Sequence, residues 1–174
     1  MKCIKTYVGL TCKPGKYDEV LKKLLFKVFV DPRDMYLLSG KVDMLIHFDG
    51  LRNLEDFVDR WFNPIRRIEI EDDFITKILS LIVISESSIP PEKPSAFVFM
   101  NSRAKNLESV RHKLLSLPNV LSACSVLGPF DLLSSVKAKN DSDLDRVVST
   151  IEDVPGVENP TAEAVDSRDI FPDW

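Results

Sequence analysis

Two predicted turns carry the side chains best suited to bind a small molecule. Each turn separates two apolar runs and has a glycine followed three residues later by an aspartate. Glycine tolerates positive φ and proline fixes its own φ, so both segments are predicted to be β-hairpin turns. Backbone N–H groups and the carboxylate there could hold the carboxylate and ammonium of an amino acid, although each aspartate could instead hydrogen-bond only its own turn. The candidate ligand-binding residues are Gly128, Pro129, Phe130 and Asp131 in the second turn and Gly40 and Asp43 in the first.

Three further side chains are candidates. Thr161 stands at the start of the last predicted strand, where it could bind a ligand or be an ordinary strand residue. His47, on a predicted strand, could ligate a metal or a haem, and Tyr7 is a second candidate for a base; a histidine facing water or hydrogen-bonded in the core is the alternative. His112 is expected on the polar side of a helix. No residue is predicted to be catalytic.

The spacing of the other polar residues indicates no further chemistry. Cys3, Cys12 and Cys124 are odd in number and lack a Cys-x-x-Cys spacing, which predicts neither a disulfide framework nor a thiolate metal site. The acidic run at 69–73 lacks a glycine-punctuated loop of oxygen ligands, so it is expected to be solvated rather than to bind a cation. The arginine pair at 66–67 is expected to be surface charge. The sequence therefore predicts no metal and no cofactor.

The composition is that of a soluble globular protein. Of the 174 residues, 44% are hydrophobic and 29% are charged, and no run is long and uncharged enough to span a bilayer. A formal net charge of −4 without a basic stripe argues against direct binding of nucleic acid. The chain moves from Met1 into an alternating strand without a signal-like apolar segment, so we expect a cytoplasmic protein with no membrane partner.

The first half of the chain predicts two helices and four strands. Strands are indicated by alternation or by β-branched runs, and helices by apolar residues at helical spacing. In chain order these are a strand at 4–11, a helix at 17–28, a hairpin at 34–49, a helix at 51–62 and a strand at 74–84. Asn63-Pro64 is expected to close the second helix.

The second half predicts the same order again. Three prolines within 88–94 and the absence of periodicity indicate a linker. After it the sequence predicts a strand at 96–100, a helix opened by Asn106, the hairpin at 120–137, a helix opened near Asn140 and an edge-like strand at 158–165. We therefore expect two domains, 1–87 and 95–174, joined by the linker at 88–94.

The order strand, helix, strand, strand, helix, strand is that of the ferredoxin-like fold. Two helices cover only one face of its antiparallel sheet, so the other face of each half needs a partner. We predict an α+β protein made of two ferredoxin-like βαββαβ repeats, with the sheets stacked face to face as a pseudo-dimeric sandwich or barrel.

The order of motifs in the second half resembles a known family. The turn at Gly128-Pro129-Phe130-Asp131 is followed by Val154-Pro155-Gly156-Val157 and then by Thr161. This pattern is similar to the effector-binding domain, or RAM domain, of the Lrp/AsnC family. The first half keeps the Gly-x-x-Asp turn but has Ile68-Glu69-Ile70-Glu71 in place of Pro-Gly-Val. The chain thus looks like a tandem duplication of this domain.

The resemblance implies a domain that dimerises through its sheets, assembles further and binds amino acids or related small molecules at subunit boundaries. The family's regulators carry an N-terminal helix-turn-helix domain, whereas the first strand here begins by Ile4. The resemblance therefore implies a sensor without its own DNA-binding domain. It would act in transcription regulation through homo-oligomers or a partner regulator protein, with an amino acid as effector. The aromatic segment 169–174 is expected either to dock on a neighbouring subunit or to fray.

An enzyme is the alternative function. Stacked ferredoxin-like units also house haem-dependent oxygenases and decarboxylases, and some enzymes of haem biosynthesis resemble the same regulator family. This alternative needs a base or an axial ligand, and His47 and Tyr7 are the candidates. We favour the sensor, and so a binding protein over an enzyme.

Overall fold

The structure is a computed structural model that describes residues 3–86 and 93–166. The chain divides into two compact units, one of Met1–Ser80 with Asp166–Trp174 and one of Leu81–Val165. The division falls within strand β4 (Ile75–Glu86), which contributes to both units. The predicted linker at 88–94, apart from Lys93 and Pro94, and the predicted docking or fraying of 169–174 lie outside the described residues.

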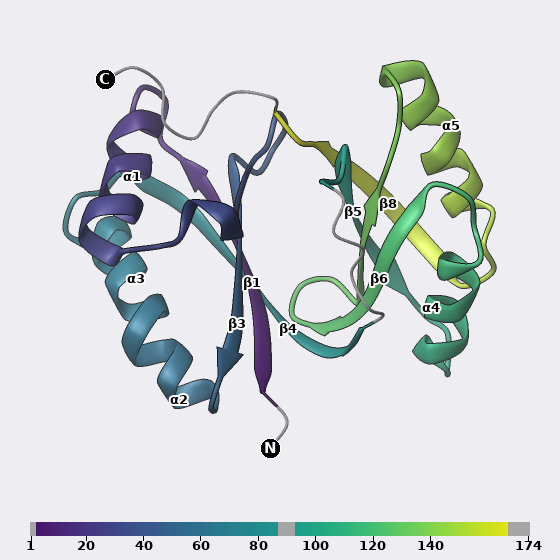
Figure 1. Cartoon of the computed structure of the whole chain (residues 1–174), viewed down its shortest axis with the longest axis horizontal. Coiled ribbons are helices and arrows are strands. Elements are labelled where there is room, and N and C mark those ends of the chain that lie inside the picture. The colour runs from purple at the N-terminus through teal and green to yellow at the C-terminus, as the bar shows by residue number, and fades with distance from the viewer. Residues whose placement is uncertain (1–2, 87–92, 167–174) are drawn as a thin grey trace. The chain divides into compact units, whose positions relative to one another are not determined.

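The first unit has the strand and helix order predicted from the sequence (Figure 1). Its strand order is β2-β3-β1-β4, and β3 pairs antiparallel with both β1 and β2. Besides the first half of β4, its elements are β1 (Ile4–Cys12), α1 (Tyr17–Lys23), the π-helical turn η1 (Leu24–Val28), the 3₁₀ turn η2 (Pro32–Asp34), β2 (Met35–Leu37), β3 (Met44–Leu51), α2 (Leu54–Phe57), the π-helical turn η3 (Val58–Phe62) and α3 (Asn63–Ile70).

The prediction that Asn63-Pro64 closes the second helix is wrong. The helical segment continues through α3 to Ile70, with Pro64 in the first turn of α3. The π-helical turn η3 stands directly before Asn63, and its wider i→i+5 pairing lets the helical segment continue past a proline whose fixed φ suits the helix. The run Ile68-Glu69-Ile70-Glu71 is therefore the end of a helix rather than a turn.

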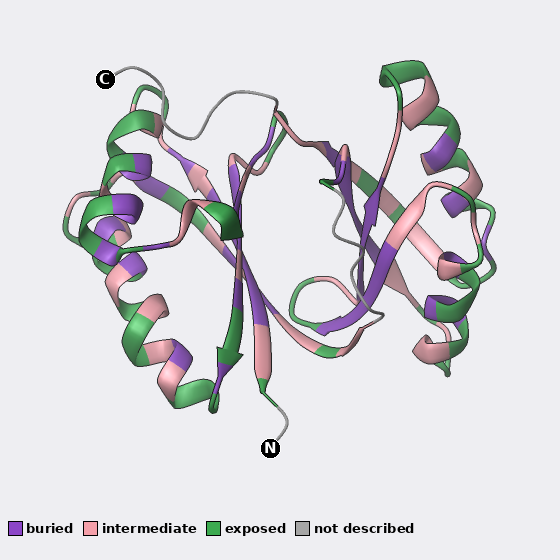
Figure 2. Cartoon of the chain, in the orientation of Figure 1, coloured by how far each residue is buried: buried purple, intermediate pink, exposed green. Residues whose placement is uncertain are grey.

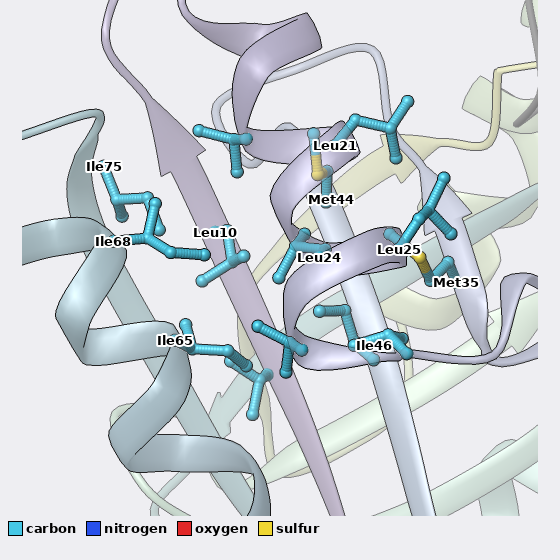
Figure 3. Packing of buried hydrophobic residues seen from close by; sticks show 14 of the residues in the cluster. Leu10, Leu21, Leu24, Leu25, Met35, Met44, Ile46, Ile65, Ile68 and Ile75 are labelled. Carbon is cyan, nitrogen blue, oxygen red and sulfur yellow. The ribbon is translucent and has the colours of Figure 1, made fainter. Parts of the chain in front are cut away.

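The core of the first unit lies between one face of its sheet and the helices α1, η1 and α3 (Figures 1 and 2). Leu24 of η1 and Ile65 of α3 are fully buried and point toward Leu10 of β1 and Ile46 of β3 (Figure 3). Burying an aliphatic side chain of this size contributes about 1.5–3 kcal/mol, so this layer dominates the stability of the unit. It also fixes which side chains of each strand face away from the helices.

The second unit has the same topology. From the second half of β4 its strand order is β4-β6-β7-β5-β8, and the pairings are antiparallel. Its other elements are β5 (Ala96–Ser102), α4 (Leu107–Leu115), β6 (Val120–Leu127), β7 (Leu132–Val136), α5 (Asp141–Glu152) and β8 (Val157–Ala164). Asn106 and Asn140 cap α4 and α5 by accepting hydrogen bonds from Ser109 N and Asp143 N, as their positions predict.

The core of the second unit again lies on the helix side of its sheet. Val110 and Leu114 of α4 and Ile151 of α5 pack in one cluster with Val98 of β5 and Ala123 of β6. The predicted α+β class and the ferredoxin-like order of both halves are confirmed. Among the described residues, no helix has the length and apolar character that crossing a membrane requires.

Candidate functional site

The hairpin aspartate of the first unit ties its turn to the end of the first strand. Asp43 Oδ2 accepts a hydrogen bond from Cys12 N at 2.7 Å. The backbone of Asp43 also donates to Leu10 O and accepts from Leu38 N, both at 2.9 Å. Burial, helped by the negative charge of Asp43, raises the pKa of the Cys12 thiol to about 12, so this thiol stays protonated at neutral pH.

The hairpin aspartate of the second unit makes the matching contacts. Asp131 Oδ2 accepts from Ser102 N at 2.9 Å, its N–H donates to Met100 O at 3.0 Å, and its carbonyl accepts from Val126 N at 2.9 Å. Each carboxylate therefore binds the first strand of its own unit rather than its own turn. One carboxylate oxygen of each aspartate is used in this way.

The other predicted ligand-binding residues lie mostly at the surface. Gly40, Gly128 and Pro129 are exposed. Phe130 is half-buried, with its ring centroid 5.3 Å from that of Phe99. The exposed Thr161 donates from its hydroxyl to Asn159 O at 3.5 Å. Gly40 and Asp43 belong to the first unit and the others to the second. Ligand binding by these residues stays a prediction.

The first unit brings together a pair of aromatic, ionisable side chains. Tyr7 of β1 stands directly opposite His47 of β3, and the two rings stack with centroids 4.7 Å apart and planes 26° apart. Paired side chains on antiparallel strands share a face of the sheet. Since their neighbours Val8 and Ile46 pack under the helices, Tyr7 and His47 lie on the opposite face. Tyr7 is 5% exposed and His47 is half-buried.

The carboxylate of Asp34, the last residue of the 3₁₀ turn η2, stands in a row with Tyr7 and His47. Met35 of β2 pairs with Ile46, so Asp34, one residue earlier, stands level with His47. Partial burial and the charge of Asp31 raise the pKa of Asp34, and the positive charge of His47 opposes this rise. Tyr36 follows on the same face, where burial and the charge of Asp34 raise its pKa. The row therefore holds a carboxylate, an imidazole and a phenol.

The side of the sheet that carries Tyr7 and His47 is charged at one end and apolar at the other. Beside the row, Lys5 Nζ lies 3.5 Å from Asp49 Oδ2. On its other side Gly9 pairs with the fully buried Leu45, and a Cβ on Gly9 would meet Leu79 Cβ at 3.4 Å. We call the surface formed by Lys5, Tyr7, Asp34, Tyr36, Leu45, His47 and Asp49 the histidine face.

The histidine face can perform acid–base chemistry. Imidazole is the side chain that exchanges a proton most readily near neutral pH, and its ring nitrogens also ligate iron. His112, by contrast, lies exposed on α4. Within residues 3–86 and 93–166 no three His, Cys, Asp or Glu side chains cluster as a metal site would require. His47 is therefore the best-placed imidazole of the described chain for chemistry.

The sequence identified Tyr7 and His47 separately but missed Asp34, Tyr36 and Lys5. Tyr7 and His47 are 40 residues apart, and their contact depends on the register between β1 and β3. Asp34 precedes a strand and reaches the row only through the register between β2 and β3. The alternation of residues along one strand shows which side chains share its face, but it does not show their cross-strand neighbours.

A second polar cluster, in the second unit, was also not predicted. Glu108 Oε1 accepts hydrogen bonds from the hydroxyls of Ser85 and Ser125, and Oε2 accepts from Arg111 Nε at 3.0 Å and Nη2 at 2.7 Å. Arg111 is 8% exposed. These bonds, led by those from Arg111, lower the pKa of Glu108 to about 2. A carboxylate that stays ionised and fully bonded suits a structural role rather than proton transfer near neutral pH.

Residues 95–165 match the model of the Lrp/AsnC ligand binding domain. The predicted relationship is thereby confirmed for this part of the chain, and the name of the domain points to a small-molecule ligand. The match does not extend to the first unit, so it does not show a tandem duplication. Comparison with curated proteins finds no match.

Solved structures match nearly the whole chain. The siroheme decarboxylase NirDL, in complex with an iron-uroporphyrin III analogue, is 9% identical over 97% of this chain and 72% of its own, with a TM-score of 0.67. A mutant chlorite dismutase from Candidatus Nitrospira defluvii, in complex with cyanide, is 10% identical over 94% of this chain and 90% of its own, with a TM-score of 0.57. A shorter protein from Thermus thermophilus, TTHA0845, is 31% identical over 46% of this chain and 99% of its own, with a TM-score of 0.40.

These comparisons correct the expected function. The structures that share the fold over nearly the whole chain include a siroheme decarboxylase, a mutant chlorite dismutase and a putative chlorite dismutase. The expectation of an amino acid sensor acting in transcription regulation is therefore wrong. The alternative, a haem-related enzyme on this scaffold, agrees better with the comparisons.

Proposed function

We propose that this chain, whose residues 95–165 form an Lrp/AsnC ligand binding domain, is an enzyme that decarboxylates an iron tetrapyrrole. The observation that carries the proposal is the stacked pair of Tyr7 and His47 on the histidine face. Two ionisable rings fixed on neighbouring strands form a rigid proton-transfer site. The fold shared with NirDL, a siroheme decarboxylase seen with an iron-uroporphyrin analogue, supports the choice of substrate.

The histidine face offers groups of the right kind for such a substrate. A tetrapyrrole is a flat apolar ring with carboxylates at its rim. The half-buried His47 offers aromatic surface, and the ammonium of Lys5, which lies 3.5 Å from Asp49 Oδ2, can pair with a rim carboxylate in place of Asp49. This side of the sheet therefore offers a cation for the carboxylates of the substrate and an aromatic side chain for its ring.

In the proposed reaction the bond between a side-chain carboxylate and its carbon breaks, and carbon dioxide leaves. A proton takes its place on the carbon. The imidazolium of His47 donates this proton, Tyr7 holds the ring in place by stacking, and Asp34 sets a negative charge level with the imidazolium. Each turnover consumes one proton and needs no oxidant.

We further propose that residues of the two hairpin turns contact a small-molecule ligand of the domain at 95–165. Phe130 offers a half-buried aromatic ring beside Phe99, and one oxygen of Asp131 is engaged by Ser102 N. We propose Gly128, Pro129, Phe130, Asp131 and Thr161 as these contacts, with Gly40 and Asp43 as their counterparts in the first unit.

The test mixes the purified protein with iron-uroporphyrin III. Absorbance spectroscopy follows binding, and mass spectrometry follows the loss of carbon dioxide. We expect a spectral shift and a decarboxylated product, with turnover reduced about 10²–10⁴-fold in His47→Ala and unchanged in His112→Ala. The two variants are matched because His112→Ala also removes an imidazole, but from the exposed side of α4.

Binding and turnover are measured separately, so each bears on a different part of the proposal. Binding without product in the unaltered protein would show that the chain holds a tetrapyrrole but does not decarboxylate it. Equal turnover in His47→Ala and the unaltered protein would remove His47 as the proton donor. No spectral shift at all would overturn the substrate class.

A further inference from the structure

The helices of the first unit carry a basic hollow on their outer side. This basic hollow lies between η1 and α3, has a volume of about 170 Å³ and is lined by Lys23, Lys27, Arg67 and Asp72 among others. A second hollow of about 310 Å³, on α3, adjoins it because Arg67 lines both. Neither hollow belongs to the histidine face.

The basic hollow has more cationic side chains than carboxylates in its lining. Lys23 Nζ pairs with Asp72 Oδ2 at 2.9 Å, so the acidic residue in the lining is already engaged. In the described part of the chain no carboxylate lies within ion-pair distance of Lys27 or Arg67. Two cations therefore face one small hollow in a chain whose net charge is −4.

Apolar side chains stand exposed around these cations. Phe29, directly after Val28 in the lining, is 75% exposed, and Ile70 in the adjoining hollow is 65% exposed. Phe29 also ends η1 with φ +63, a left-handed backbone conformation that is unfavourable for a bulky residue. An aromatic side chain that is exposed on a left-handed backbone, one residue after the lining residue Val28, is typical of a surface that binds a partner.

We propose that the basic hollow binds the segment 167–174 of the same chain. This segment reads Ser-Arg-Asp-Ile-Phe-Pro-Asp-Trp and combines two aspartates and one arginine with three large apolar side chains. Its aspartates complement Lys27 and Arg67, and its aromatic rings complement Phe29 and Ile70. The match is one of charge and of apolar surface together.

The start of the segment lies in the right unit. The N–H of Asp166 donates to Leu37 O of β2 at 2.7 Å. Above β2, Leu25 of η1 packs beside Met35 (Figure 3). Eight extended residues span at most about 26–29 Å, whereas a helix with its side chains is about 10–12 Å across. The extended length of the segment is therefore about twice the width of a helix such as η1.

The test uses the full chain with Trp61→Phe, which leaves Trp174 as its sole tryptophan. Acrylamide quenching of the fluorescence measures how far Trp174 is shielded from solvent. We expect strong shielding that is lost on the double charge reversal Lys27→Glu, Arg67→Glu. The quenching constant should then rise to that of a synthetic peptide of residues 167–174 in free solution. Lys105→Glu, Lys113→Glu, an equal charge change on exposed residues of the second unit, is the matched control and should keep the shielding.

Three results would overturn the proposal. Quenching as strong as in the free peptide without any charge reversal would show that the segment is unbound. Shielding that survives the reversal at Lys27 and Arg67 would place the segment elsewhere. Shielding that grows with protein concentration would show that the hollow binds the segment of a second copy. Circular dichroism of each variant confirms that the charge reversals leave the fold intact.

Discussion

Asp43 and Asp131 each satisfy the backbone N–H of a residue that ends the first strand of a unit. The partners are Cys12 and Ser102, and in both units the aspartate backbone adds two more bonds to the same strand or hairpin. Hydrogen bonds that involve a charged group are stronger than neutral ones, and a partly buried N–H that loses its partner carries a desolvation cost. These aspartates therefore hold the hairpins in place.

We predict that Asp131→Ala lowers the free energy of unfolding by about 1–3 kcal/mol, because Ser102 N loses its acceptor. Asp43→Ala should have an effect of similar size through Cys12 N. Asp131→Asn is the control, since its amide oxygen can still accept the bond. Urea unfolding followed by circular dichroism measures the change. An Asp131→Ala protein as stable as the unaltered chain would show that the carboxylate is not needed for the fold.

The carboxylate of Glu108 makes the stability of the folded chain depend on pH in the acid range. Glu108 has a pKa of about 2 in the folded chain, against an ordinary value of 4.5, so folding favours its ionised form. That contribution is complete above pH 4.5 and is lost as the pH falls toward 2. The gap in melting temperature between the unaltered protein and Glu108→Gln should therefore be widest at neutral pH and narrow steadily below pH 4.5.

Melting curves recorded from about pH 7 down to about pH 3 measure this gap. Glu152→Gln, which changes an exposed carboxylate at the end of α5, is the control and should leave the curve nearly unchanged. A gap that stays constant with pH would mean that Glu108 contributes by packing rather than by charge.

At the scale of elements, the connections between helices and strands decide how closely the layers pack. Gly156, in the turn between α5 and β8, has φ +96. A Cβ added there would lie 3.0 Å from Val110 Cγ2 on α4 and 3.2 Å from Ala104 Cβ. This glycine meets two demands at once, a left-handed backbone and a close approach to the helix layer.

We predict that Gly156→Ala lowers the free energy of unfolding by about 2–4 kcal/mol, from left-handed strain and overpacking together. Gly15→Ala is a matched control, because Gly15 has φ +80 but no atom within 4 Å of its added Cβ. It should lose only the strain, about 1–2 kcal/mol. Urea unfolding of both variants gives the difference. Equal losses would mean that α4 shifts enough to accommodate the methyl group.

At the scale of the whole molecule, the sequence predicted the elements better than the site. Alternation and helical spacing located the strands and most helices, because each pattern is local. The predicted stop at Pro64 is wrong because the π-helical turn η3 before it lets the helical segment continue past the proline. The row of Asp34, His47 and Tyr7 could not be predicted, because it depends on two cross-strand registers that the local pattern does not specify.

The function was misjudged for a related reason. The motifs that carry the family resemblance lie in residues 95–165, so they predict a binding site at the hairpin of the second unit. The ionisable row lies in the first unit, which that match does not include. The sequence indicates His47 and Tyr7 as possible catalytic groups, but the neighbours of each residue along the chain do not show that the two rings stack.

The position of strand β4 limits where the chain can be divided into separate parts. Its twelve residues begin in the first unit and end in the second, where Ile82 and Val83 pair with β6. A break of the chain between Ser80 and Leu81 would divide strand β4, and a break after Glu86 would separate β6 from the strand with which it pairs. Neither half can be exchanged as a free module. A substitution in β4 can therefore change the stability of both units.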